Sequence, residues 1–191
     1  LDNEKSGKFD IFLWRIARGA HVALYPNMNV ADPVWAKLMR DVRFRRALSL
    51  AVDREAVNES LFFGQAIQGN NTLLPDSPLF REKYQKNWAE FDLDMASDLL
   101  DQIGLTEYND DDVRLLPDSR PLEIIVETAG EDTEQTDVLE LIAENWAEIG
   151  IKMFIKPSQR EVFRNRIFSG QALMSIWSGL ENGVATAESS P

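Results

Sequence analysis

The amino-acid sequence predicts a single α/β domain built on a mixed sheet flanked by helices, and three observations support this. The run 122–127, the helical stripe 134–149 and the alternating run 151–156 have the lengths of a right-handed parallel strand–helix–strand unit. No internal repeat, low-complexity tract or linker divides the 191 residues. Other short runs rich in β-formers are also readable as strands: 11–16, 20–26 and 172–177.

Helix signals separate these expected strands. Asp41 is a plausible N-cap, and Asp53 is expected to cap a second helix that stops at Gly64. Asp92 opens a further helix, which Gly104 closes. We therefore expect helices over 41–52, 53–63 and 92–103.

The remaining segments carry turn or capping signals. We expect a loop around Asp32 and Pro33, and an ordered loop over 65–80. The stretch 113–127 has two apolar runs around a Pro-Asp-Ser turn, which suggests a hairpin. "SQRE" at 158–161 has the spacing of a capping box for a helix through Phe168.

Charge and composition exclude several classes of function. There are 20 Lys and Arg against 32 Asp and Glu, so the net charge of −12 repels phosphate backbones and anionic membranes. The absence of cysteine excludes disulfides, thiolate metal sites and cysteine nucleophiles. No apolar run approaches the roughly 20 residues of a membrane span, and the first residues have no signal-peptide pattern. Because the sequence begins with leucine, we expect the start of the gene product to be missing.

No catalytic or metal-binding constellation stands out. His21 is the only histidine, no "GxSxG" accompanies it, and we expect it to be a half-buried strand residue. Asp110, Asp111 and Asp112 lack the EF-hand spacing, so a solvated turn is expected there. A hydrolase with a carboxylate pair stays open, because nothing in the spacing selects or excludes a pair.

Several motifs occur together in one order. They are "DVRFRRALSLAVDREAVNESLFFG", "LLPDSPLF", "FDLDMASDLLDQIGL", "NWAEIGIKMFI", "REVFRNRIFSG" and "IWSG". Across roughly positions 20 to 185 this series resembles the extracellular solute-binding proteins of family 5, the oligopeptide- and dipeptide-type receptors of ABC importers.

The resemblance implies a periplasmic-binding-protein type II-like lobe. The matching stretch is similar to the C-terminal lobe of a two-lobe receptor, so 1–191 is expected to be one lobe cut at both ends. It further implies a non-catalytic protein without cofactor, which passes a small solute to permease subunits of an ABC transporter. The protein is expected to be periplasmic, or extracellular and membrane-associated through the transporter. An interaction module is the other alternative, and an exposed lobe face is expected to permit a dimer.

The end of the last strand is the expected binding site. Trp177 can offer a flat apolar face to cargo, and the backbone of Ser178 and Gly179 can approach it closely. The alternative is that Trp177 belongs to the core. Peptide receptors resemble "W-x-x-D", whose aspartate receives an ammonium group, but this chain has Leu180 there.

Glu181 or Asn182 is a candidate substitute for that aspartate, although neighbours on an extended chain point to opposite sides. Peptide, oligosaccharide and opine therefore remain open as ligands, with nickel complexes last.

The arginines of 41–55 are expected to serve the scaffold. Burial of each large apolar side chain is worth roughly 1.5–3 kcal/mol, whereas exposed ion pairs contribute about 0–1 kcal/mol. The apolar stripe through Phe44, Leu48 and Val52 therefore determines this helix's role. Arg43, Arg46 and Arg54 are expected to pair with neighbouring acids.

Overall fold

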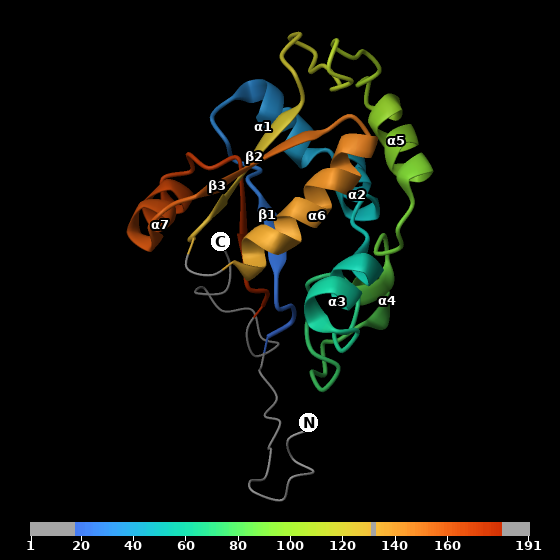
Figure 1. The fold of residues 1–191 in the computed structure, drawn as a ribbon, viewed down its shortest axis with the longest axis vertical. Coiled ribbons are helices and arrows are strands. Elements are labelled where there is room, and N and C mark those ends of the chain that lie inside the picture. Colours follow the sequence, from blue (N-terminus) through green and yellow to red (C-terminus); the bar gives the residue numbers. More distant parts are fainter. Residues whose placement is uncertain (1–17, 131–132, 181–191) are drawn as a thin grey trace, which may run out of the picture.

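One four-stranded sheet organises the protein (Figure 1). The structure is a computed structural model that describes residues 18–130 and 133–180. The strands are β1 (Ala23–Pro26), β2 (Glu123–Thr128), β3 (Lys152–Pro157) and β4 (Met174–Trp177). Their order is β1-β4-β2-β3, with β2 parallel to both β3 and β4, and β1 antiparallel to β4. The prediction of a mixed sheet is confirmed, whereas the expected strand at 11–16 lies outside the described residues.

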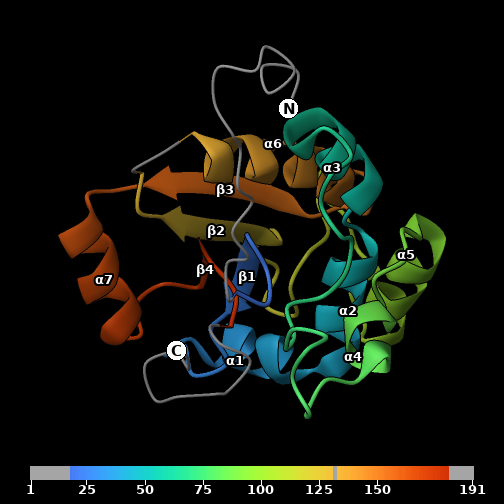
Figure 2. The ribbon, with the colours of Figure 1, turned by 90° about the horizontal axis from the view of Figure 1, so that it is seen from below.

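Helices flank this sheet on both sides. They are α1 (Pro33–Arg40), α2 (Val42–Leu50), α3 (Arg54–Phe62), α4 (Glu82–Lys86), α5 (Leu93–Gln102), α6 (Glu134–Glu148) and α7 (Arg160–Phe168). Seen from below, α2, α3, α4 and α5 lie to one side of the strands and α7 to the other (Figure 2). Across the described ranges, no helix has both the length and the apolar character needed to cross a membrane.

Three helix starts follow the sequence prediction closely. The side chains of Asp41, Asp53 and Asp92 accept hydrogen bonds from the backbone amides two or three residues on, at 2.8–2.9 Å. Each side chain thereby satisfies one of the amides that a helix start leaves without a partner. These caps are local, which explains why the sequence alone located α2, α3 and α5.

Three expectations about connections need correction. The stretch after Asp32 is helix α1 rather than a loop, because Asp32 caps the amides of Val34 and Trp35 and proline suits the first helical position. The capping box before α7 is wrong: Gln159 holds the N-cap position, and the buried Ser158 Oγ has no hydrogen-bond partner. In the expected hairpin, the turn forms, but only isolated bridges such as Leu115 to Pro121 surround it.

The core joins the sheet to α2 and α6. Trp146 of α6 is fully buried, and its indole N–H donates to the carbonyl of Leu48 in α2 at 3.2 Å. Ile124 and Val126 of β2 are also fully buried. The strand–helix–strand unit β2-α6-β3 therefore supplies the wall on which α2 packs, as the apolar periodicity indicated.

The arginines around α2 contact other parts of the chain, as the scaffold hypothesis requires, but only one of the three makes the expected ion pair. Arg43 binds Asp41 at 2.7 Å, as predicted. Arg46 instead lies over the ring of Trp88, 4.3 Å from its centroid. Arg54 donates to the carbonyls of Ser49 and Ala89, and burial lowers the pKa of its guanidinium.

A second arginine, Arg114, connects the ends of α5 and α6 by hydrogen bonds. Arg114 is 1% exposed and donates to the carbonyls of Leu105 and Ile149 and to the hydroxyl of Ser97. Its guanidinium also pairs with Asp101 of α5. Buried carbonyl groups need such partners, so this one side chain stabilises three segments at once.

Replacing Arg114 by alanine should therefore cost about 3 kcal/mol or more of unfolding free energy, because buried acceptors lose their donors. Urea denaturation measures this loss. Arg120→Ala is the control, since Arg120 is an exposed arginine that also bridges acids, Asp32 and Asp118. A loss of unfolding free energy no greater than that of the control would show that the hydrogen bonds of Arg114 do not stabilise the fold in this way.

Acid should weaken the start of α1. The hydrogen bond from Arg120 lowers the pKa of Asp32 below its usual 3.8, so stability from this pair is present above about pH 3.8 and is lost as the pH falls further. Asp32→Asn keeps a capping side chain but cannot titrate. We expect the variant to be less stable than the parent at pH 6 and the difference to shrink toward pH 2. Asp110→Asn, in an exposed turn, is the control; a constant difference for Asp32→Asn would contradict the linkage.

Candidate functional site

Three parallel strands bring their carboxyl ends to one edge of the sheet. Thr128 of β2 lies opposite Pro157 of β3, and Trp177 ends β4 at the same edge. The antiparallel β1 begins there, with Ala23 opposite Trp177. In open α/β sheets this edge is where ligands bind. We call it the carboxyl edge.

Trp177 lies half-buried at this edge, between core and surface. Its ring stacks on Phe163 of α7, with centroids 5.7 Å apart and planes 24° from parallel. The guanidinium carbon of Arg160, one turn earlier in α7, lies 5.7 Å from the indole centroid. The edge therefore presents an aromatic ring beside a cation, held by one helix.

The residues after Trp177 are bound to the rest of the chain. The Ser178 carbonyl accepts from the Tyr25 hydroxyl at 2.7 Å, and the Gly179 amide donates to the Ala20 carbonyl at 2.9 Å. Burial raises the pKa of the Tyr25 hydroxyl, although its hydrogen bond with Asn71 opposes the shift. These backbone groups serve internal pairing in this structure. Glu181 and Asn182 lie outside the described residues.

Asn71 is a residue beside the carboxyl edge that sequence reasoning missed. Its side-chain oxygen accepts from the Leu180 amide at 3.0 Å, and its Nδ2 donates to Tyr25 at 3.5 Å. A Cβ on Gly179 would lie 2.3 Å from that Asn71 oxygen and 2.6 Å from the Ala20 nitrogen. Neighbouring atoms of the chain therefore leave no room for a side chain at position 179, which explains the glycine there.

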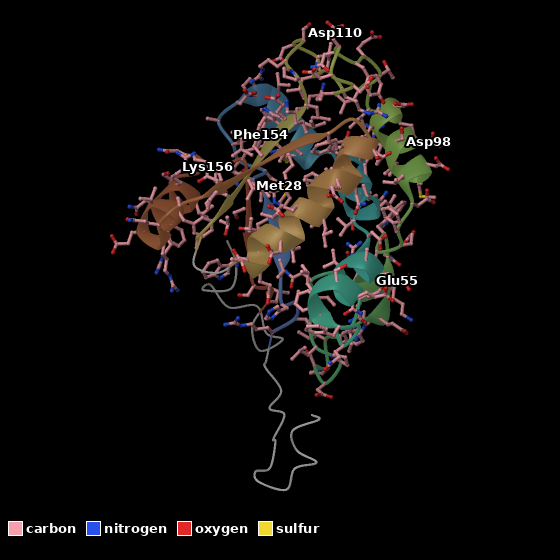
Figure 3. All side chains as sticks on the ribbon, in the orientation of Figure 1. Met28, Glu55, Asp98, Asp110, Phe154 and Lys156 are labelled. Atoms are coloured by element: carbon pink, nitrogen blue, oxygen red, sulfur yellow. The ribbon has the colours of Figure 1, made fainter. Side chains whose placement is uncertain are left out.

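A buried ion pair fixes α7 against the sheet. Glu127 of β2 is 1% exposed and accepts a bidentate set of hydrogen bonds from Arg166, including two at 2.7 Å. These bonds raise the pKa of the Arg166 guanidinium. Lys156, labelled in Figure 3, lies 3.8 Å from the same carboxylate. Glu127 was not a candidate from sequence, because no local spacing connects β2 with α7.

Two hollows adjoin the carboxyl edge. A shallow groove is lined by 129–130 and 157–160. A cavity of about 350 Å³ runs along β1, and its apolar walls include Leu24, Leu48, Val57 and Ile142. Trp177 lines neither hollow. Its exposed surface and the cavity are therefore separate features of the same edge.

His21 is exposed, which corrects the expectation of a half-buried strand residue. It precedes β1, and its Nε2 lies 2.8 Å from Glu134 of α6. Its ring meets Phe62 edge-on, with centroids 5.6 Å apart.

Asp110, Asp111 and Asp112 form an exposed turn, as predicted; Asp110 is labelled at the top of Figure 3. Within 18–130 and 133–180, no three His, Asp or Glu side chains gather where they could hold a metal ion.

Gly179→Ala should lower the melting temperature by about 4 °C or more, because its Cβ would collide with Asn71 and Ala20. Calorimetry measures the change. Ser178→Ala is the matched control, since it removes only a hydroxyl from the neighbouring position. Equal melting temperatures for Gly179→Ala and the parent would show that this contact is not tight.

Comparison with known proteins identifies relatives of this chain. The family described as bacterial extracellular solute-binding proteins, family 5 Middle, matches residues 2–188. The dipeptide-binding protein of Escherichia coli is 25% identical over 163 residues, which are 83% of this chain and 28% of the relative. Heme-binding protein A of Haemophilus influenzae is 26% identical over 145 residues, which are 75% of this chain and 24% of the relative.

A solved structure shares the fold. The oligopeptide-binding protein OppA superposes with a TM-score of 0.85 at 36% identity, over 93% of this chain and 28% of OppA. The chain spans about a quarter of the length of these relatives. The match of the family over nearly all residues, together with this fold, places the chain: it belongs to the bacterial extracellular solute-binding proteins of family 5.

Proposed function

We propose that residues 1–191 form one α/β lobe, the C-terminal lobe of a two-lobe receptor that captures a small solute for an ABC importer. Membership of family 5 supports the receptor role, and relatives about four times as long leave room for a second lobe. The family is extracellular by description, and we place the receptor in the periplasm beside its permease. The role is binding, without a chemical step.

The observation that carries this proposal is the position of Trp177. Its ring ends a parallel strand at the edge where such sheets bind ligands, and it stays half-buried because α7 supports it from one side. A flat ring supported in this way loses little side-chain freedom on contact with cargo. The ring can stack on a sugar face or on an apolar peptide side chain.

The cargo belongs to the peptides, oligosaccharides or opines. Leu180 stands where the resemblance places an aspartate, so a free ammonium group finds no carboxylate from that side chain. Peptide-binding names among the relatives support peptide, and the Arg160 guanidinium near Trp177 suits a carboxylate or carbonyl. Glu181 and Asn182 remain candidate contacts.

Capture works by closure of two lobes. Ligand contacts made from both sides stabilise the closed form over the open one, and the closed receptor then engages the permease. A single lobe supplies only part of the contacts. We therefore expect the isolated 191-residue chain to bind no solute at micromolar concentration, as calorimetry with peptide, oligosaccharide and opine libraries would test; micromolar binding would contradict the two-lobe mechanism.

The decisive variant is Trp177→Ala in the full-length receptor. A thermal-shift screen first identifies the solute, and titration then measures its affinity. We expect a loss of about tenfold or more, because a buried aromatic contact is worth roughly 1.4 kcal/mol or more. Phe168→Ala is the control, since Phe168 is an exposed aromatic of the neighbouring α7. Unchanged affinity for Trp177→Ala would overturn the proposed contact.

Dimerisation through an exposed lobe face remains a prediction and finds no support among the relatives. Light scattering of the 191-residue chain would test it.

A further inference from the structure

One flank of this acidic protein is basic. The chain has 20 Lys and Arg against 32 Asp and Glu, yet residues 152–168, which hold β3 and α7, contain five Lys or Arg and one Glu. The other residues therefore carry 15 cations against 31 acids. The exposed acids Asp98 and Asp110 lie away from Lys156, at the other sides of the view in Figure 3. Charge is thus separated across the lobe, with the positive side at β3 and α7.

On β3, basic side chains stand on either side of an exposed aromatic one. Side chains two residues apart on a strand point to the same side of the sheet, so Lys152, Phe154 and Lys156 share one side. Phe154 is 43% exposed, and the Lys152 ammonium lies 5.3 Å from the centre of its ring. Ile125, opposite Phe154 on β2, is exposed as well and enlarges this apolar spot.

Helix α7 has the same combination on its outer side. Arg164 and Phe168 are four residues apart and so are neighbours on the helix surface, with the guanidinium carbon 5.7 Å from the ring centre. Phe168 is 75% exposed. The side of α7 that faces the sheet carries Phe163, which stacks on Trp177. The helix therefore presents one side to the carboxyl edge and a basic, aromatic side to the outside.

A shared carboxylate brings the two parts together. The Lys156 ammonium and the Arg166 guanidinium lie 3.8 and 2.7 Å from the same oxygen of Glu127. That carboxylate is 1% exposed, so it adds no negative charge to the surface above it. We define the basic flank as Lys152, Phe154, Lys156, Arg164 and Phe168.

The chemistry of the basic flank suits an acidic protein surface. Aromatic side chains and arginine are enriched in protein interfaces, and cations form their strongest hydrogen bonds with carboxylates. An anionic membrane fits less well, because an extended plane of phosphates also meets the acidic remainder of the lobe and is repelled by it. A local group of carboxylates on a protein meets the basic flank alone.

We infer that the lobe docks on its permease through the basic flank, and that the matching surface of the permease is acidic and partly apolar. The inference rests on the proposed function and adds to it a docking surface and the chemistry of the partner. Arg164 and Phe168 lie on the helix that supports Trp177. Docking and cargo binding therefore share α7 but use different side chains.

Uptake and affinity measured on the same variants separate docking from cargo binding. The full-length receptor is returned to a bacterial strain that lacks it, and the initial uptake of the solute identified by thermal shift is measured at saturating concentration and equal receptor levels. Arg164→Glu should lower uptake by about tenfold, because a reversed charge slows association with an acidic surface. The affinity of this purified variant for the solute should stay within about twofold of the parent. Phe168→Ala should lower uptake in the same direction with affinity unchanged.

Lys37→Glu is the matched control, since it makes the same change of charge at an exposed position of α1. Equal losses of uptake for Arg164→Glu and Lys37→Glu would reduce the effect to net charge and overturn the inference. Unchanged uptake for Arg164→Glu would overturn it too. A loss of solute affinity parallel to the loss of uptake would assign the basic flank to the cargo site instead.

Two further measurements test other occupants of the basic flank. Binding of the parent, but not of Arg164→Glu, to phosphatidylglycerol vesicles would replace the permease by the membrane. In the folded full-length receptor, maleimide should label Phe168→Cys within about tenfold of its rate in urea, because an uncovered thiol stays accessible. Labelling slower by about 100-fold or more would mean that the rest of the receptor covers the flank, and the inference would fail.

The proposed function and this inference fail in different ways. A parent receptor that binds no solute and restores no uptake would contradict the proposed function. A parent that binds and imports the solute, while Arg164→Glu imports it equally well, would contradict only docking through the basic flank.

Discussion

The parallel pairing of β2 with β3 and β4 is the constraint on which the rest of the structure depends. Parallel neighbours cannot be joined by a tight turn, so the chain must return across the sheet through α6 and α7. Each return starts at the same edge. The carboxyl ends of three strands, the starts of two helices and the start of β1 therefore meet in one place. Side chains that are distant in sequence become neighbours there.

Helix α7 depends on few contacts for its position at that edge. Only Phe163 of its nine residues is buried, and it stacks on Trp177. The second attachment is the pairing of Arg166 with Glu127. Because both attachments involve the carboxyl edge, the orientation of α7 and the orientation of the indole are set together. A change in either attachment would move the aromatic surface that the solute is proposed to meet.

Local signals in the sequence predicted much of the fold. Asp41, Asp53 and Asp92 cap helices with their own neighbours, and the alternation of apolar residues located β2, α6 and β3. Helix α1 was missed because Asp32 and Pro33 are typical both of loops and of helix starts. The carboxyl edge was predicted as the binding site from the rule that ligands meet open α/β sheets at the carboxyl ends of their strands, together with the family resemblance. Asn71 could not be found, because its bond to Leu180 spans 109 residues and no pattern in either segment indicates the other.

The burial of Glu127 should make the attachment of α7 insensitive to the salt concentration. Dissolved ions gather around charges that water surrounds, such as those of Lys86 and Glu82, and screen their fields with a Debye length of about 8 Å at physiological salt. The carboxylate of Glu127 is 1% exposed, so counterions have little access to it. The attachment of α7 beside the indole should therefore keep its geometry from dilute to brackish surroundings.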